Sequence, residues 1–130
     1  MQRNVGIWID HKQALVLQVE NGKRNLQVIE SHIEPVLRFP RRGVGSEDLP
    51  TEVHADHRYQ EHLKAFYEQI KSTLQAADSI LILGPGEAKL ELQKTLSRSK
   101  VLRTRIAGIE TADKMSPRQL AAKVRQFFAA

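Results

Sequence analysis

The sequence predicts a single α/β domain in which a mixed β-sheet carries helices on its faces. Near the N-terminus apolar residues alternate with other residues, as they do in antiparallel strands. Further along they recur at three- and four-residue spacing, and these helix patterns separate two later strand candidates. The length of 130 residues suits one domain, and a content of 41% hydrophobic and 27% charged residues is typical of a folded globular chain.

The first third of the chain predicts three antiparallel strands. In residues 5–9 the β-branched Val5, Ile7 and Ile9 alternate with Gly6 and Trp8. The apolar residues 14–19 follow the polar His11-Lys12-Gln13, and together the two stretches predict a hairpin. Asn21-Gly22 supplies two residue types that tolerate the positive φ angles of a type I′ turn. This turn leads into a third predicted strand at residues 25–33.

Residues 34–56 contain Pro35, Pro40 and Pro50 and show no sustained periodicity, so they predict a loop. A loop of this length in a small domain tends to be functional or mobile. From residue 57 to about residue 77 a helical stripe follows, which predicts the first helix. The stripe consists of Leu63, Phe66, Tyr67, Ile70 and Leu74.

Residues 79–83 are apolar after the first serine and free of charge, the pattern of a strand covered on both faces. They end at Gly84-Pro85-Gly86, and residues 87–97 then predict a second helix. Its inward residues are predicted to be Leu90, Leu92 and Leu96.

Residues 101–109 predict a further strand, with Arg103 and Arg105 on a solvated face. Ser116-Pro117 and Gln119 stand in capping-box register and predict the start of the last helix. The predicted order is therefore β-β-β-α-β-α-β-α. This is the order of a ribonuclease H-like mixed sheet, and it fills residues 1–130 as one domain.

Charge and composition narrow the classes of function. The chain has no cysteine, which excludes disulfides, thiolate nucleophiles, cysteine-based zinc fingers and iron–sulfur clusters. The net charge is +5: residues 1–86 hold ten basic and eleven acidic residues, and residues 87–130 hold ten and four. This excess favours a polyanionic partner.

Asp10, His11 and Lys12 interrupt the first apolar run, so we expect no signal peptide and no membrane span, and a cytoplasmic location.

The segment after residue 83 has two interpretations. Backbone amides at a helix start can hold an anion, with Lys89 nearby. Alternatively, Gly84-Pro85-Gly86 is a structural turn between strand and helix. The segment matches neither of the two common glycine-rich phosphate motifs.

The stretch ILILGPGEAKLELQKTL resembles the corresponding segment in the central domain of Pelota and of the archaeal and eukaryotic class one peptide-chain release factors. The opening stretch GIWIDHKQALVLQV is similar to the first hairpin of that domain. Over roughly residues 4–110 the chain is similar to this family and looks like one of its small stand-alone bacterial relatives. The resemblance implies a ribonuclease H-like fold and a role in translation.

One difference from the release factors bears on activity. Those factors carry a Gly-Gly-Gln tripeptide in the loop after the third strand and use it to promote peptide release, but this sequence contains no Gly-Gly-Gln. Its Phe39-Pro40-Arg41-Arg42-Gly43 is more similar to the basic loop of Pelota. The resemblance therefore implies a non-catalytic module without a cofactor, associated with the ribosome, rRNA or tRNA. A homo-oligomer is a further expectation.

Two groups of cations are candidates for RNA contact, because arginine and lysine can bind phosphates. The first is the loop group Arg38, Arg41 and Arg42; acidic residues follow it closely, so a solvated loop is the alternative. The second group extends from the second helix onward; the helix dipole, which favours cations near a helix C-terminus, is the alternative explanation for Arg98. With Lys89 added, it consists of Lys89, Lys94, Arg98, Lys100, Arg103 and Arg105.

An enzyme is the alternative function, namely a metal-dependent nuclease or hydrolase. Asp10 follows the first strand, where ribonuclease H-like nucleases place a catalytic carboxylate, and Glu61 or Glu68 could assist from the helix. A turn aspartate bonded to local amides is the simpler interpretation of Asp10. A second cluster could bind a metal or form a polar helix start, and it consists of His54, Asp56, His57, Glu61 and His62.

Overall fold

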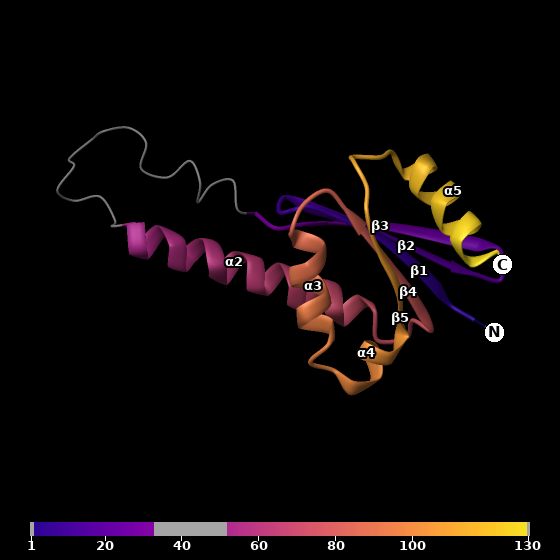
Figure 1. The fold of residues 1–130 in the computed structure, drawn as a ribbon, viewed down its shortest axis with the longest axis horizontal. Helices are drawn as coiled ribbons and strands as arrows, with labels where there is room; N and C mark the ends of the chain where they lie inside the picture. The colour runs from indigo at the N-terminus through magenta and orange to yellow at the C-terminus, as the bar shows by residue number, and fades with distance from the viewer. Residues whose placement is uncertain (1, 33–51, 130) are drawn as a thin grey trace.

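The computed structural model describes residues 2–32 and 52–129, with side chains in the second range described from residue 58 onward. Its five strands form one sheet in the order β3-β2-β1-β4-β5 (Figure 1). β1 and β2 are antiparallel, as are β2 and β3, whereas β4 is parallel to both β1 and β5. The strands are β1 (Asn4–Ile9), β2 (Gln13–Glu20), β3 (Lys23–Glu30), β4 (Ser79–Gly84) and β5 (Ile106–Thr111).

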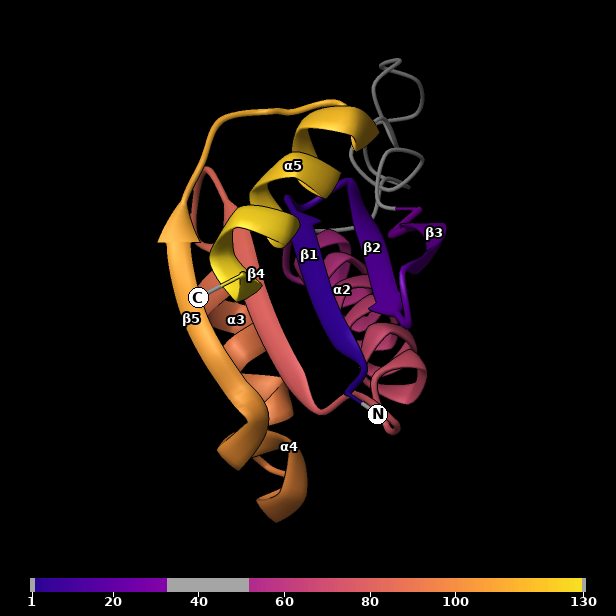
Figure 2. The same cartoon turned by 90° about the vertical axis from the view of Figure 1, so that its right-hand side faces the viewer.

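Helices cover both faces of this sheet (Figure 2). On one face α2 and α3 enclose a core with β1 and β4, centred on Ile7, Phe66 and Ile82. On the other face α5 packs over Trp8 and Leu83. The helices are α2 (Glu52–Thr73), α3 (Ala88–Leu96), α4 (Lys100–Arg105) and α5 (Pro117–Phe128).

This is the predicted mixed sheet of a ribonuclease H-like fold, with one additional short helix, α4, before β5. The strand predicted at residues 79–83 is confirmed as β4. Its predicted cover on both faces is confirmed too, because Ile80, Leu81, Ile82 and Leu83 are fully buried. The predicted type I′ turn is consistent with the positive φ angles of Asn21 (54°) and Gly22 (78°). Within the described residues, no helix has the length and apolar run that crossing a membrane requires.

The strand predicted at residues 101–109 is wrong in its first half. Residues 100–105 form α4, whose N-cap Ser99 accepts a hydrogen bond from the Leu102 amide at 3.2 Å. Only Leu102 of this helix is buried, whereas Val101 is 52% exposed. The apparent alternation of apolar and basic residues therefore has no sheet face behind it, and the strand starts at Ile106.

Three smaller predictions also need correction. Leu90 is 51% exposed, because it lies two residues before Leu92 and therefore on the opposite side of α3. α2 begins at Glu52, so the last five residues of the predicted loop are helical; no proline or glycine follows Pro50 there to prevent it. β3 spans residues 23–30 rather than 25–33, because the preceding turn needs only two residues.

Candidate nucleic-acid interface

The carboxyl ends of the parallel neighbours β1 and β4 meet at one edge of the sheet. A Cβ atom on Gly84 would overlap the carbonyl oxygen of Ile9, so this close approach of the strands requires glycine. In the turn that follows, Lys89 Nζ donates a hydrogen bond to the Gly86 carbonyl, and Lys89 is only 8% exposed. Its ammonium group therefore closes the turn and is not presented to a ligand at the surface.

Asp10 at the same edge is bonded to its own turn. Its Oδ1 accepts hydrogen bonds from the amides of Lys12 at 2.8 Å and Gln13 at 2.9 Å. β4 ends in glycine, and among the described residues no three histidine or carboxylate side chains are grouped so that they could hold a metal. The side chains of His54, Asp56 and His57 lie outside that description. The donor set that a two-metal nuclease needs is thus not assembled among the described residues.

Glu91 on α3 connects three elements of the fold. Its carboxylate accepts a hydrogen bond from Tyr67 Oη of α2 at 2.6 Å and lies 3.1 Å from His11 Nε2 in the β1–β2 turn. Burial, together with the hydrogen bond to Glu91 and its charge, raises the pKa of Tyr67 well above its usual range. Burial, and then the charge of Glu91, raises the pKa of Tyr59 as well. Both phenols therefore resist ionisation at alkaline pH more than an ordinary tyrosine does.

Beside this cluster, α2 and α3 enclose an open groove of about 420 Å³. Three of its eight lining residues are cationic and one is acidic. Lys94 and Arg98 stand four residues apart and face the groove together, and both are exposed. The residues of this cationic groove are Gln60, Leu63, Lys64, Tyr67, Glu91, Lys94, Thr95 and Arg98.

The cations of α4 divide into two kinds. Lys100 and Arg103 are exposed and continue the positive charge beyond Arg98. Arg105 instead donates from Nη1 to the carbonyl of Ala77 at 2.7 Å, which ties the end of α4 to the segment before β4. Arg105 is thus engaged by the fold, whereas the other two side chains are open to a ligand.

The predicted basic residues therefore do not form one patch. The structure brings Lys94 and Arg98 together in the cationic groove and places Lys100 and Arg103 on the next helix. The loop group Arg38, Arg41 and Arg42 lies outside the described residues. Sequence reasoning missed Lys64, although its position on the polar side of the α2 stripe was the available signal.

The chain matches no family model and no curated protein. Its fold is that of a domain found in translation factors. It is similar to the Pelota protein of Thermoplasma acidophilum (TM-score 0.59, 16% identity, 96% of this chain and 32% of that one). It is also similar to the archaeal translation termination factor aRF1 (0.62, 14%, 95% and 34%). A third similar structure is Dom34 of S. cerevisiae (0.52, 16%, 93% and 32%), described as a translation termination-like factor involved in RNA quality control.

At these identities the likeness concerns the fold alone. The chain spans about a third of the length of each of these three proteins. The resemblance to the Pelota and release-factor domain is thereby supported at the level of architecture. Activity and partners require a separate argument.

Proposed function

We propose that this chain is a non-catalytic RNA-binding module of the translation machinery that contacts rRNA or tRNA through the cationic groove and α4. The observation that carries the proposal is the convergence on one groove of Lys64 from α2, Lys94 from α3 and Arg98 from the turn after α3. The fold, which resembles that of Pelota, aRF1 and Dom34, makes translation the first setting to test. A cytoplasmic location is part of the proposal.

Phosphate contact explains how such a groove would bind. Arginine can contact two phosphate oxygens at once, and lysine supplies a point charge. Tyr67, the aromatic residue that lines the groove, is buried and donates its hydroxyl to Glu91, so it offers no open face for stacking with a base. Binding should therefore depend on the nucleic-acid backbone rather than on base sequence. Arg38, Arg41 and Arg42 would add contacts to the same partner.

Co-sedimentation of the protein with purified ribosomes over a series of salt concentrations tests the proposal. The double variant Lys94→Glu/Arg98→Glu should lose most of the ribosome-bound fraction. A plot of log affinity against log salt concentration has a negative slope. For contacts with single-stranded RNA, loss of two phosphate contacts makes that slope less steep by about 1.4. The slope can be measured by fluorescence anisotropy on a labelled rRNA fragment.

Lys114→Glu/Arg118→Glu is the matched control. It makes the same change of charge with two exposed residues, Lys114 before α5 and Arg118 in its first turn. Figure 2 shows α5 on the opposite face of the sheet from α2 and α3. This variant should bind as the unchanged protein does. Equal losses in both variants would mean that net charge alone drives binding, and no bound fraction at low salt would reject the proposed function.

A further inference from the structure

β3 is an end strand of the sheet that the described residues form. Among the described residues it pairs only with β2, and Figure 2 shows it at the sheet margin away from β5. Every residue from Lys23 to Val28 is exposed, and only Ile29 is buried. An edge strand with free backbone groups is a template for pairing with another strand.

The hydrogen-bond pattern shows which β3 residues point outward. The Ser31 amide donates to the Lys12 carbonyl at 2.9 Å, so residues 12 and 31 form a hydrogen-bonded pair of the β2–β3 ladder. Such pairs alternate along an antiparallel ladder. Residues 23, 25, 27 and 29 therefore bond to β2. The backbone groups that face away from β2 are those of Arg24, Leu26, Val28 and Glu30.

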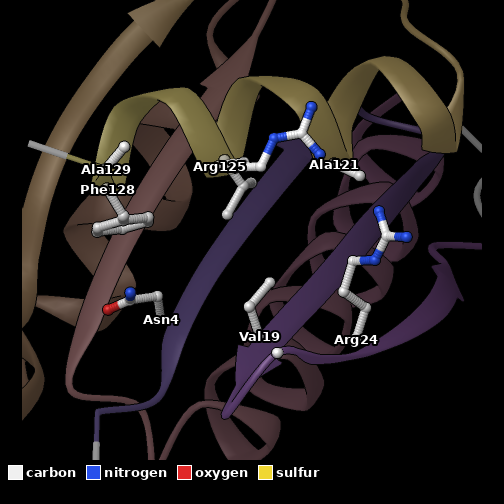
Figure 3. Close-up of a pocket in the computed structure, with 9 residues that line it drawn as sticks. Asn4, Val19, Arg24, Ala121, Arg125, Phe128 and Ala129 are labelled. Carbon is white, nitrogen blue, oxygen red and sulfur yellow. The ribbon is translucent and has the colours of Figure 1, made fainter.

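The same four residues share the sheet face that α5 covers. Leu26 stands opposite Leu17 and Val28 opposite Leu15, and both β2 residues belong to the core under α5. β3 extends beyond that cover, which leaves Leu26 37% and Val28 50% exposed. Figure 3 shows Arg24 on this face, at the rim of a 470 Å³ pocket between the strands and α5.

Along β3 this face presents a cation, two apolar side chains and an anion in that order. A second copy that runs antiparallel presents the reverse order, so that cation and anion can face each other. In an antiparallel pair with a two-fold axis at Gln27, Arg24 faces Glu30 and Leu26 faces Val28, each twice. Backbone groups that face away from β2 in one copy must hydrogen-bond to those that face away from β2 in the other. Any alternative pairing therefore shifts the two-fold axis by whole residues along β3. An axis at Leu26 leaves both charges without an opposite charge, and an axis at Val28 places Glu30 opposite Leu26.

We propose that β3 pairs with β3 of a second copy of this chain, antiparallel and with the two-fold axis at Gln27. The pairing joins the two sheets into one, bonds the backbone groups of Arg24, Leu26, Val28 and Glu30 that face away from β2, and covers Leu26 and Val28. It makes two ion pairs across the junction. The proposal does not depend on RNA binding, because it uses none of the cationic groove.

A single cysteine tests the register. The chain contains no cysteine, so Gln27→Cys introduces one thiol per copy. At the axis the two Cα atoms would be about 4.5 Å apart, which a disulfide can span. The matched control is Asn25→Cys, on the same face of β3, where the two Cα atoms would be about 14 Å apart. Mild oxidation should give a covalent dimer of the first variant and little of the second, and equal yields would overturn the proposal.

Charge exchange tests the interface without cross-linking. In sedimentation equilibrium the unchanged protein should dimerise, and Arg24→Glu or Glu30→Arg should each weaken the dimer about tenfold. The double variant Arg24→Glu/Glu30→Arg should restore it. Arg103→Glu reverses a charge on α4, next to the opposite sheet edge, and should leave the dimer intact. A monomeric unchanged protein, or a double variant as weak as the single ones, would overturn the proposal.

Discussion

The two glycines of Gly84-Pro85-Gly86 should respond very differently to the same substitution. Gly84 is held on both sides: β1 lies against it, and its carbonyl accepts a hydrogen bond from the Ala112 amide at 3.0 Å. A Cβ atom in Gly84→Ala would overlap the Ile9 carbonyl oxygen and would also lie 3.3 Å from the Ile9 carbonyl carbon. The obstacle is backbone, so no side-chain rotation can relieve it.

The expected magnitude follows from this geometry. Overpacking a core usually costs about 1–3 kcal/mol, and the upper end applies where β1 and β4, rather than a flexible side chain, must move apart. We therefore expect Gly84→Ala to lower the free energy of unfolding by about 3 kcal/mol. For a domain of this size that loss lowers the melting temperature by roughly 10 °C.

Urea unfolding followed by far-ultraviolet circular dichroism measures this loss, with Gly86→Ala as the control. A Cβ atom on Gly86 meets nothing within 4 Å, and its φ angle is not positive. We expect this variant to stay within about 0.5 kcal/mol of the unchanged protein. The reasoning is refuted if the two variants unfold at the same urea concentration.

Three further predictions concern packing, capping and ionisation. Gly6→Ala should destabilise the fold because its Cβ would overlap Val124 Cγ2, and Val124→Ala in the same chain should recover part of the loss in urea unfolding. Ser116→Ala should cost about 1 kcal/mol in the same assay, because Ser116 accepts the Gln119 amide in the α5 capping box. The raised pKa of Tyr67 means that the folded state resists ionisation, so stability present below pH 10.0 should fall as the pH rises above it. Tyr67→Phe should reduce that fall in urea midpoints measured from pH 8 to 11.

The parts of the fold that could be predicted from sequence are those with a local physical signal. The α5 capping box joins Ser116 and Gln119 only three residues apart, and both of its hydrogen bonds are present. Asn21-Gly22 adopts the positive φ angles that these residue types tolerate. In both cases neighbouring residues determine the backbone, so the rest of the molecule adds little information.

Elements that depend on distant contacts could not be predicted in the same way. α4 forms because Ser99 caps it, because Leu102 enters the core and because Arg105 reaches the Ala77 carbonyl. The last contact joins residues 28 positions apart. From sequence alone, the alternation around Arg103 predicts a strand. The error therefore arose where tertiary contacts override a short local pattern.

The candidate interface shows the same division between local and distant information. The count of basic residues in the last third of the chain treats every cation as equivalent, but the fold engages several of them. Lys123 Nζ, for example, lies 2.7 Å from Glu110 Oε1. Lys89 bonds to Gly86 and Arg105 bonds to Ala77, so neither adds freely to an electrostatic surface. Lys64, from the part of the chain that showed no excess of basic residues, lines the groove instead. Whether a cation can meet a ligand is thus decided by its hydrogen-bond partner in the fold, and a count along the chain contains no such information.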